Sequence, residues 1–434
     1  MDGLTRRDFL AASGVAAGAA WAGSALGGLG DLLGAEPALA APGAGATFTD
    51  GQNQLAAARA LIQNNWYLPV EDLAPDEMRI SFMGTSFTPR QIQAMNSVFI
   101  EVGTGQSFVF DLGSGTLTKY TAMGIPPSRM AHVFITHLHA DHMSGLVALY
   151  CFGAAKDRQT PLHIYGPSGP ILDHVEYKDE GTNAFCAALG ALSKWHTEAM
   201  SFLPTGLPDG QDGYQLRPHE LPYRLDPGVA YEDDDVVITH FPAAHDRDGS
   251  ISYKIEFNDM KVVFSGDTKP TDWMLKHGKG VDVLIHEMAL SVNDWVTHES
   301  GLYPGDDGYQ FAYDKLQEIQ DNSHTPELAL GETLAATRPK LGVITHCHFN
   351  QDTFITAVDR VRKLYNGPLA WAIDTTVLNL RPEQPIKQRQ ALIPSAGWDI
   401  ATQMYPAYAP PKYNGPYAQF SDFTMRHILP KYKT

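Results

Sequence analysis

The sequence is poor in cysteine and in clustered cationic residues. It has three Cys among 434 residues, too few and too scattered for a disulfide framework or a thiolate metal site. The net charge is −17, and we find no Lys/Arg cluster. An acidic surface repels phosphate backbones, so a nucleic-acid partner is not expected.

Long apolar runs and the common nucleophile motifs are also missing. No stretch after residue 40 reaches the ~18 apolar residues that cross a bilayer, so we expect a mature chain without a membrane span. There is no Gly-x-Ser-x-Gly motif for a serine nucleophile. Gly166-Pro-Ser-Gly169 lacks the Gly-Lys-Thr/Ser ending of a phosphate-binding P-loop and is expected to be a plain turn.

The first forty residues have the features of a targeting segment. Thr5-Arg6-Arg7-Asp8-Phe9-Leu10 resembles the twin-arginine export signal, and an Ala/Gly-rich stretch follows it. Ala38-Leu39-Ala40 fits a small-residue cleavage site, which predicts a signal peptide over residues 1–40 and a mature chain from Ala41. The expected partner is the twin-arginine export machinery, and the expected location is periplasmic or extracellular.

The remaining chain alternates between strand-like and helix-like segments. We expect an N-terminal extension over 41–76 with a short helix at 54–64, a main domain over 77–380, and an extended Pro- and aromatic-rich tail over 381–434. Within the domain, 169–230 is predicted to be a mostly helical and irregular insertion. Strands are predicted at 79–83, 97–102, 107–111, 131–136, 162–165, 236–239, 251–257, 261–264, 281–285, 341–345 and 369–373, and helices at 144–153, 326–337 and 353–365. Two batches of strands, each followed by helices, predict an α/β (four-layer α+β) fold: an αββα sandwich of two packed sheets with helices outside.

The strongest chemical signal is Thr136-His137-Leu138-His139-Ala140-Asp141-His142, directly after an apolar strand. Three imidazoles and a carboxylate within six residues offer nitrogen and oxygen ligands of the kind that zinc prefers. Loops at strand ends commonly carry function, so we interpret this segment as a metal-binding loop.

This His-x-His-x-Asp-His pattern resembles the signature of the metallo-β-lactamase superfamily. Further elements of that pattern follow in order: His245 before a strand hairpin, Asp267 in Phe264-Ser-Gly-Asp267-Thr268, and His346 after the strand at 341–345. Asp111-Leu112-Gly113 fits the Asp-x-Gly motif of the family. The resemblance covers about residues 79 to 380.

The resemblance implies two divalent metal ions, with zinc expected and manganese or iron left open. His137, His139 and His245 look like ligands of one ion; Asp141, His142 and His346 look like ligands of the other. Asp267 looks like the bridging carboxylate, and Asp111 looks like an outer partner that holds a ligand imidazole. Two positions have alternatives, His240 for His245 and His348 for His346.

A second pair of residues resembles the ribonuclease Z branch of this superfamily. His286-Glu287 ends the strand after Asp267, and Ser323-His324-Thr325 precedes a predicted helix. In that branch such a His protonates the leaving oxygen and the Glu supports the imidazolium. The resemblance therefore adds His324 and Glu287 to Asp141 and Asp267 as catalytic candidates, although His286 and His324 also fit ordinary capping or surface positions.

Together these features predict a binuclear hydrolase whose bridging hydroxide attacks a small sulfate or phosphate ester, as arylsulfatase-like and phosphodiesterase-like relatives do. Metal pairs ~3.5–4 Å apart lower the pKa of a shared water towards ~7. A lactonase or β-lactamase-type hydrolase is the alternative, and a non-catalytic binding protein is a remote one. Insertion aromatics (Trp195, Phe202, Tyr214) either hold an aryl group or pack the insertion. The oligomeric state stays open.

Overall fold

The computed structural model describes residues 66–391 apart from 68, 70, 200–211 and 234. The predicted signal peptide, the helix at 54–64 and the tail beyond residue 391 lie outside the described residues. Contacts divide the chain into two units, and the larger includes Leu73–Lys387. In the smaller unit, β1 (Trp66–Tyr67) pairs in parallel with β18 (Lys387–Ala391).

The first sheet of the larger unit contains the strand that leads into the His-rich motif. Its order is β17 (Thr376–Leu380), β2 (Met78–Gly84), β3 (Ser97–Val102), β4 (Ser107–Phe110), β5 (His132–Phe134), β6 (Leu162–Pro167) and β9 (Leu216–Leu221). From β4 to β9 the strands are parallel. The carboxyl end of β5 therefore lies beside those of β4 and β6.

The second sheet has the order β10 (Gly228–Glu232), β11 (Val236–Pro242), β12 (Ile251–Phe257), β13 (Met260–Phe264), β14 (Val283–Glu287), β15 (Leu341–Thr345) and β16 (Leu369–Trp371). β12 is antiparallel to both of its neighbours, and β13 to β16 are mutually parallel. Hence β11, β13, β14 and β15 run in one direction and end at the same edge.

The two sheets pack face to face because their strands alternate in what they bury. Val262 and Phe264 of β13 join residues of both sheets in a central apolar core, whereas Val263 between them faces a separate core under the helices. That outer core includes Leu330 and Val361.

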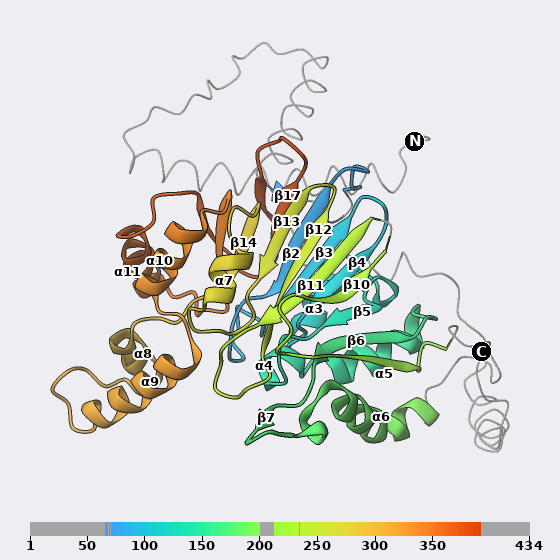
Figure 1. Cartoon of the computed structure of the whole chain (residues 1–434), viewed down its shortest axis with the longest axis horizontal. Coiled ribbons are helices and arrows are strands. Elements are labelled where there is room, and N and C mark those ends of the chain that lie inside the picture. The colour runs from blue at the N-terminus through green and yellow to red at the C-terminus, as the bar shows by residue number, and fades with distance from the viewer. Residues whose placement is uncertain (1–65, 68, 70, 200–211, 234, 392–434) are drawn as a thin grey trace, which may run out of the picture. The chain divides into compact units, whose positions relative to one another are not determined.

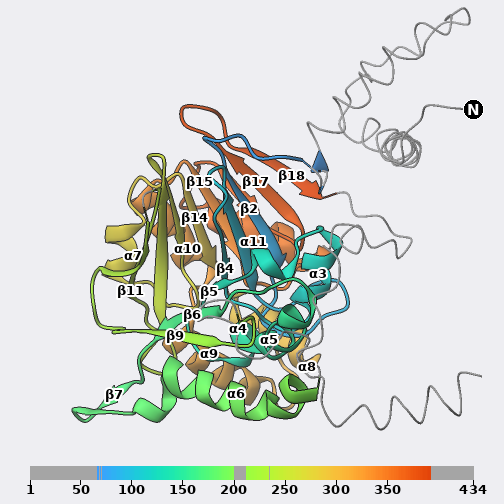
Figure 2. The same cartoon turned by 90° about the vertical axis from the view of Figure 1, so that its right-hand side faces the viewer.

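Helices cover the outer faces of both sheets, as Figures 1 and 2 show. On the first sheet these are α3 (Thr116–Ala122), α5 (Leu146–Lys156) and α6 (Thr182–Ala199), and on the second α7 (Asp272–His277), α10 (Glu327–Thr337) and α11 (Gln351–Arg362). A helical hairpin, α8 (Val292–Ser300) and α9 (Tyr309–Ser323), projects from the same side as α10. The predicted αββα sandwich is confirmed. No helix of the described residues is long and apolar enough to span a membrane.

The interpretation of 169–230 as mostly helical and irregular is wrong in part. It contains α6 and a short 3-10 helix (Lys178–Glu180), but β9 extends the first sheet and β10 the second, while β7 (Ile171–Leu172) pairs with β8 (Val175–Glu176). β9 was missed because Leu-Arg-Pro-His-Glu-Leu reads as polar and contains Pro218. A proline is tolerated there because β9 is an edge strand and Pro218 needs no ladder donor.

Candidate metal centre and active site

The candidate ligands lie where strands of both sheets end. The His-rich segment follows β5, and its short helix α4 (Ala140–Met143) carries Asp141 and His142. His245, Asp267 and His346 follow β11, β13 and β15. Because these three strands run in one direction, the loops after them meet at one edge, opposite the loop after β5.

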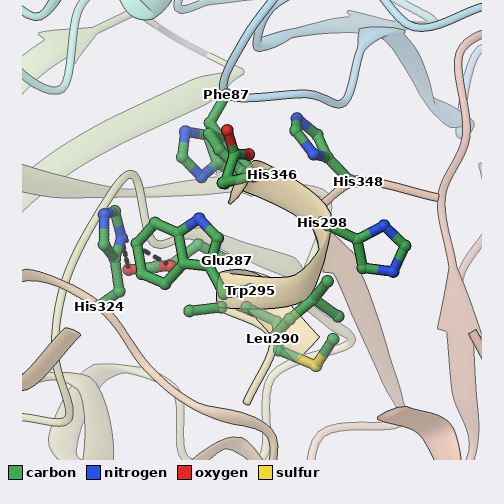
Figure 3. A pocket seen from close by; sticks show the side chains of 11 residues that line it. Phe87, Glu287, Leu290, Trp295, His298, His324, His346 and His348 are labelled. Carbon is green, nitrogen blue, oxygen red and sulfur yellow. Dashed lines mark hydrogen bonds and ion pairs between the residues drawn. The ribbon is translucent and has the colours of Figure 1, made fainter. Parts of the chain in front are cut away.

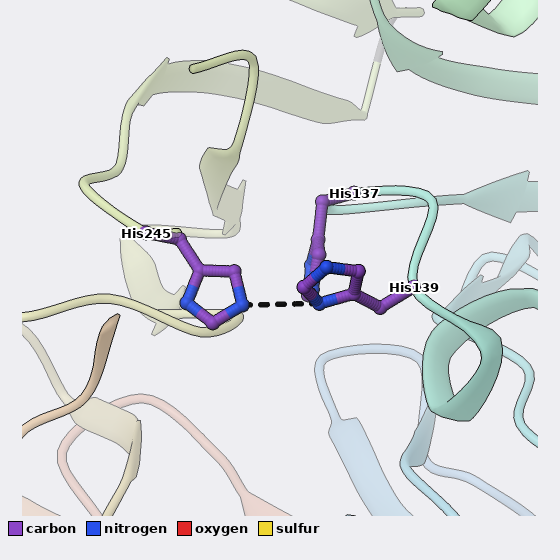
Figure 4. A group of neighbouring side chains, drawn as sticks. All are labelled: His137, His139 and His245. Carbon is purple, nitrogen blue, oxygen red and sulfur yellow. Dashed lines mark hydrogen bonds between the residues drawn. The ribbon is translucent and has the colours of Figure 1, made fainter. Parts of the chain in front are cut away.

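His137, His139 and His245, here called the histidine set, converge on one point (Figure 4). His139 Nδ1 lies 3.0 Å from His137 Nε2 and 3.1 Å from His245 Nε2. Ligand atoms around a tetrahedral zinc lie about 3.3 Å apart, given Zn–N bonds of ~2.0–2.1 Å. The His245 Nδ1–H donates to the Ser323 carbonyl at 2.9 Å, which leaves Nε2 free to face the set.

Asp141, His142, Asp267 and His346 form a second group, here called the carboxylate set. His346 Nε2 lies 3.0 Å from Asp141 Oδ2 and 3.2 Å from Asp267 Oδ1. His142 Nε2 lies 3.1 Å from Asp141 Oδ2 and 3.3 Å from Asp267 Oδ1. The other oxygen of Asp267 lies 3.9 Å from His245 Nε2. One carboxylate therefore faces both sets with different oxygens.

Two features of the carboxylate set suit a divalent cation: its negative charge and its buried polar atoms that lack a hydrogen-bond partner within the described part of the chain. Burial acts to lower the pKa of His142, but Asp267, Asp111 and Asp141 raise it well above the ordinary value. Three carboxylates thus favour a positive charge at this point. His142 Nε2 and Asp267 Oδ1 are buried without a hydrogen-bond partner among the described residues. A cation between them would satisfy both atoms.

Asp111 supports the carboxylate set from behind. Its Oδ2 lies 2.7 Å from His142 Nδ1, and its Oδ1 accepts the Thr136 N–H at 2.8 Å. Asp111 and His346 both have positive φ, 56° and 53°, which side-chain-bearing residues seldom adopt. The surrounding loops hold two residues of the site in this conformation.

The structure separates the two pairs of alternatives left by the sequence. His245 lies in the histidine set, whereas His240 is buried in β11 and its pKa falls to about 4 because of burial. His346 lies in the carboxylate set. His348 instead pairs with Thr88 at 2.8 Å and stacks on Phe87. All seven predicted ligands are brought together, and their binding of metal stays a prediction.

Glu287 and His324 meet beside both sets. His324 Nδ1 lies 3.1 Å from each carboxylate oxygen of Glu287, and Glu287 Oε1 also accepts the Thr268 N–H at 2.8 Å. Burial acts to lower the pKa of His324, but Glu287 outweighs it and raises the pKa to about 9. His286 points elsewhere, with Nδ1 2.8 Å from the Glu287 carbonyl.

Comparison with known proteins finds similarity to ribonucleases Z and BN. A family model described as anti-Pycsar protein Apyc1 matches residues 78–169. Ribonuclease Z of Methanothermobacter thermautotrophicus is 26% identical over 240 residues, 49% of this chain and 75% of that protein. Ribonuclease BN of Proteus mirabilis is 24% identical over 308 residues, 62% and 88% of the two proteins. A solved structure of human tRNase Z, short form, aligns with TM-score 0.47 and 20% identity over 69% of this chain and 98% of that one.

The chain is similar in sequence to ribonuclease Z and ribonuclease BN. Its seven candidate ligands lie at or after the ends of strands from both sheets. Beside them lie Glu287, at the end of β14, and His324, at the end of α9. This placement agrees with an enzyme that acts on ester bonds.

A pocket of this protein opens next to the carboxylate set (Figure 3). Its open volume is about 400 Å³, including solvent at the mouth. Glu287, His324 and His346 form its polar wall, and Phe87 and Trp295 belong to its aromatic wall. The sequence reasoning missed both aromatics, although Ser291 is a typical N-cap residue, and its side chain accepts the Asp294 N–H at the start of the helix that carries Trp295.

Two of the insertion aromatics, Trp195 and Tyr214, for which aryl binding and packing were both open, do not line this pocket. Trp195 is 81% exposed on α6, and Tyr214 is buried against Tyr150. Phe202 lies outside the described residues. The position of Tyr214 therefore supports a role in packing the insertion.

Proposed function

We propose that this hydrolase binds two divalent cations and hydrolyses a small phosphate or sulfate ester. The observation that carries the proposal is the Glu287–His324 pair, placed within ligand-atom distance of both metal sets. A lactone or β-lactam hydrolase needs the metals but usually not this pair. Zinc is favoured because five of the seven ligands are imidazoles, and three of these five form a set without any carboxylate.

A small substrate is favoured over RNA by the charge of the chain. The relatives are named ribonuclease Z and ribonuclease BN, and ribonucleases cleave phosphodiester bonds. This chain carries a net charge of −17, which disfavours a polyanion. We therefore propose that this chain hydrolyses esters, as these relatives do, but that its substrate is a small molecule.

The protein residues divide the work between metal binding and proton transfer. Cations in the two sets would polarise the ester and activate water near neutral pH. Asp267 holds the two sets together because each of its oxygens faces one of them. The imidazole of His324 is oriented by Glu287 through Nδ1, so its Nε2 can donate a proton to the departing oxygen.

The test of this role is His324→Ala assayed against esters of increasing leaving-group pKa. Nitrophenolate leaves without a proton, whereas an alkoxide needs one. We expect little loss with nitrophenyl esters and a loss of ~10²–10⁴-fold with poor leaving groups, the usual contribution of general acid catalysis. Glu287→Gln should show the same selectivity more weakly. Metal content must be unchanged in both variants.

The pH profile tests the same role. A donor must be protonated, and the pKa of His324 is raised to about 9, so the proton is present below that pH. The rate with poor leaving groups should fall as pH rises through about 9 in the wild type, and this fall should be absent in His324→Ala. An equal loss across all leaving groups, with an unchanged pH profile, would assign His324 to positioning instead.

The reaction class is tested by a substrate panel on the metal-loaded protein. It compares nitrophenyl sulfate, bis-nitrophenyl phosphate, a lactone and a chromogenic β-lactam. Turnover of the phosphate or sulfate ester is expected. Turnover of the lactone or β-lactam alone would overturn the proposal.

We also propose export by the twin-arginine route, on the strength of Arg6, Arg7 and the Ala38-Leu39-Ala40 site. With both arginines changed to lysine, the precursor should remain in the cytoplasm, folded and active. Undiminished arrival of this variant in the periplasm would contradict the route.

A further inference from the structure

Trp295 lies on α8 outside every described apolar core. Val292 and Val296 of the same helix are buried in a small core with Tyr309 of α9. Trp295 is absent from that core and from the two larger ones, and it lines the pocket beside His324 and His346 instead. A large aromatic side chain is thus placed against the active site rather than in the interior.

The pocket wall is a continuous face of α8. Trp295, His298 and Glu299 recur at positions i, i+3 and i+4, which share one side of a helix, and all three line the pocket. The face combines one indole with two polar groups, as Figure 3 shows for Trp295 and His298. Such a surface suits a ligand that has a flat apolar body and polar edges.

Phe87 completes the aromatic part of the wall from the loop after β2. Its ring centroid lies 6.2 Å from that of Trp295, at an interplanar angle of 73°. On its other side Phe87 stacks on His348 at 4.0 Å and 11°, so its orientation is fixed. The Trp295 ring also lies 6.2 Å from His324. The wall therefore begins beside the proposed proton donor.

A network of charges fixes α8 against the body. Arg360 Nη1 lies 2.6 Å from Asp294 Oδ2 and 3.0 Å from Glu327 Oε1, and Glu327 Oε1 also accepts the Ser291 N–H at 2.8 Å. Ser291 caps the first turn of α8. The helix that presents Trp295 is thus tied to α10 and α11.

We infer that Trp295 and Phe87 form a binding subsite for a flat ring on the leaving group, so the substrate is an aryl or nucleoside ester rather than a simple alkyl ester. The inference rests on the proposed function, because it takes His324 as the group that faces the leaving oxygen. The subsite determines specificity and takes no part in proton transfer.

The test compares phosphodiesters with the same retained methyl group and two leaving groups of similar acidity, phenyl and hexafluoroisopropyl. In Trp295→Ala, KM for the phenyl ester should rise roughly 5- to 100-fold, the scale of ring stacking on an aromatic side chain. The rise for the fluoroalkyl ester should be several times smaller. Trp295→Phe should restore most of the difference. The methyl ester of a nucleoside 5′-phosphate forms a third arm, and whether it or the phenyl ester has the lower KM identifies the ring.

Trp273→Ala is the matched control, because Trp273 is on α7 and does not line the pocket; it should not change the ratio of the KM values. An equal rise for ring and fluoroalkyl esters in Trp295→Ala would overturn the inference while leaving ester hydrolysis intact.

Binding of phenylphosphonate and methylphosphonate to the metal-loaded protein separates the two proposals without turnover. Tighter binding of the phenyl compound, lost in Trp295→Ala, is expected. If no ester is hydrolysed yet this preference is found, the proposed function fails and the ring subsite stands. Equal binding of both phosphonates would overturn the subsite.

Discussion

The histidine set and the carboxylate set differ in the chemistry and the burial of their ligand side chains. In the histidine set all three ligands are imidazoles, and His139 is exposed to solvent. The carboxylate set contains Asp141 and Asp267, and its other ligands His142 and His346 are buried. Behind it Asp111 adds a third carboxylate, 2.7 Å from His142 Nδ1.

Because of this difference, charge and burial favour cation binding at the carboxylate set more than at the histidine set. The histidine set offers neutral donors, of which His139 is exposed, and it faces only the Asp267 oxygen that it shares with the other set. A cation there would gain less from the surrounding charge. The carboxylate set keeps negative charge in a region of low exposure, where electrostatic attraction is stronger than in water. We expect the carboxylate set to hold its cation more tightly and to release it later on chelation.

The largest effect should come from the residue that the two sets share. Asp267→Ala removes the oxygen that faces His245 and the oxygen that faces His346. Both occupancies should fall, and the rate should drop by more than ~100-fold, the upper end of what changes to outer partners cost. Metal analysis and kcat/KM measure this, with Asp272→Ala on the exposed start of α7 as control. Loss of one metal alone would show that Asp267 belongs to a single set.

The next largest effect is a difference in stability between a variant of the histidine set and a variant of the carboxylate set. His139→Ala should cost one cation and leave the metal-free fold within about 0.5 kcal/mol of wild type, as exposed positions usually do. His142→Ala removes the imidazole that pairs with the buried carboxylate of Asp111, which then keeps only hydrogen bonds from Thr136 and Asn96. The metal-free protein should then lose about 3–5 kcal/mol of unfolding free energy. Denaturant unfolding of the chelated variants checks this, and equal losses in both would argue against the asymmetry.

A smaller effect is expected from the support behind the carboxylate set. Asp111→Asn keeps the shape but removes the charge that faces His142 Nδ1 at 2.7 Å. The affinity of the carboxylate set should fall ~10–100-fold, and that of the histidine set should change little. Competitive chelator titration reports the two affinities separately. If the histidine set weakened first, the role given to Asp111 would be wrong.

The sequence could predict the ligands because they sit at strand ends with a recognisable spacing. His137 to His142 follow one buried strand and His346 follows another, so short apolar runs located them. The sheet order could not be predicted in the same way. β17 pairs with β2 across almost the whole domain, and nothing local to Thr376–Leu380 indicates its partner.

The pocket could not be predicted from the sequence, because its aromatic residues are far apart in the chain. Phe87 lies soon after β2 and Trp295 lies between β14 and α9, 208 positions later in the chain. Only the folded structure brings their rings within 6.2 Å. The N-cap residue Ser291 predicts a helix but not the surface that this helix faces.

Metal content tests the central claim most directly. Elemental analysis of the purified chain should find about two divalent ions per molecule, with zinc favoured, and chelation should abolish hydrolysis until metal is restored. The first ion released should come from the histidine set, so half-depleted protein should resemble His139→Ala in its chelator affinity. Fewer than one tightly bound ion per chain, with hydrolysis surviving chelation, would contradict the account.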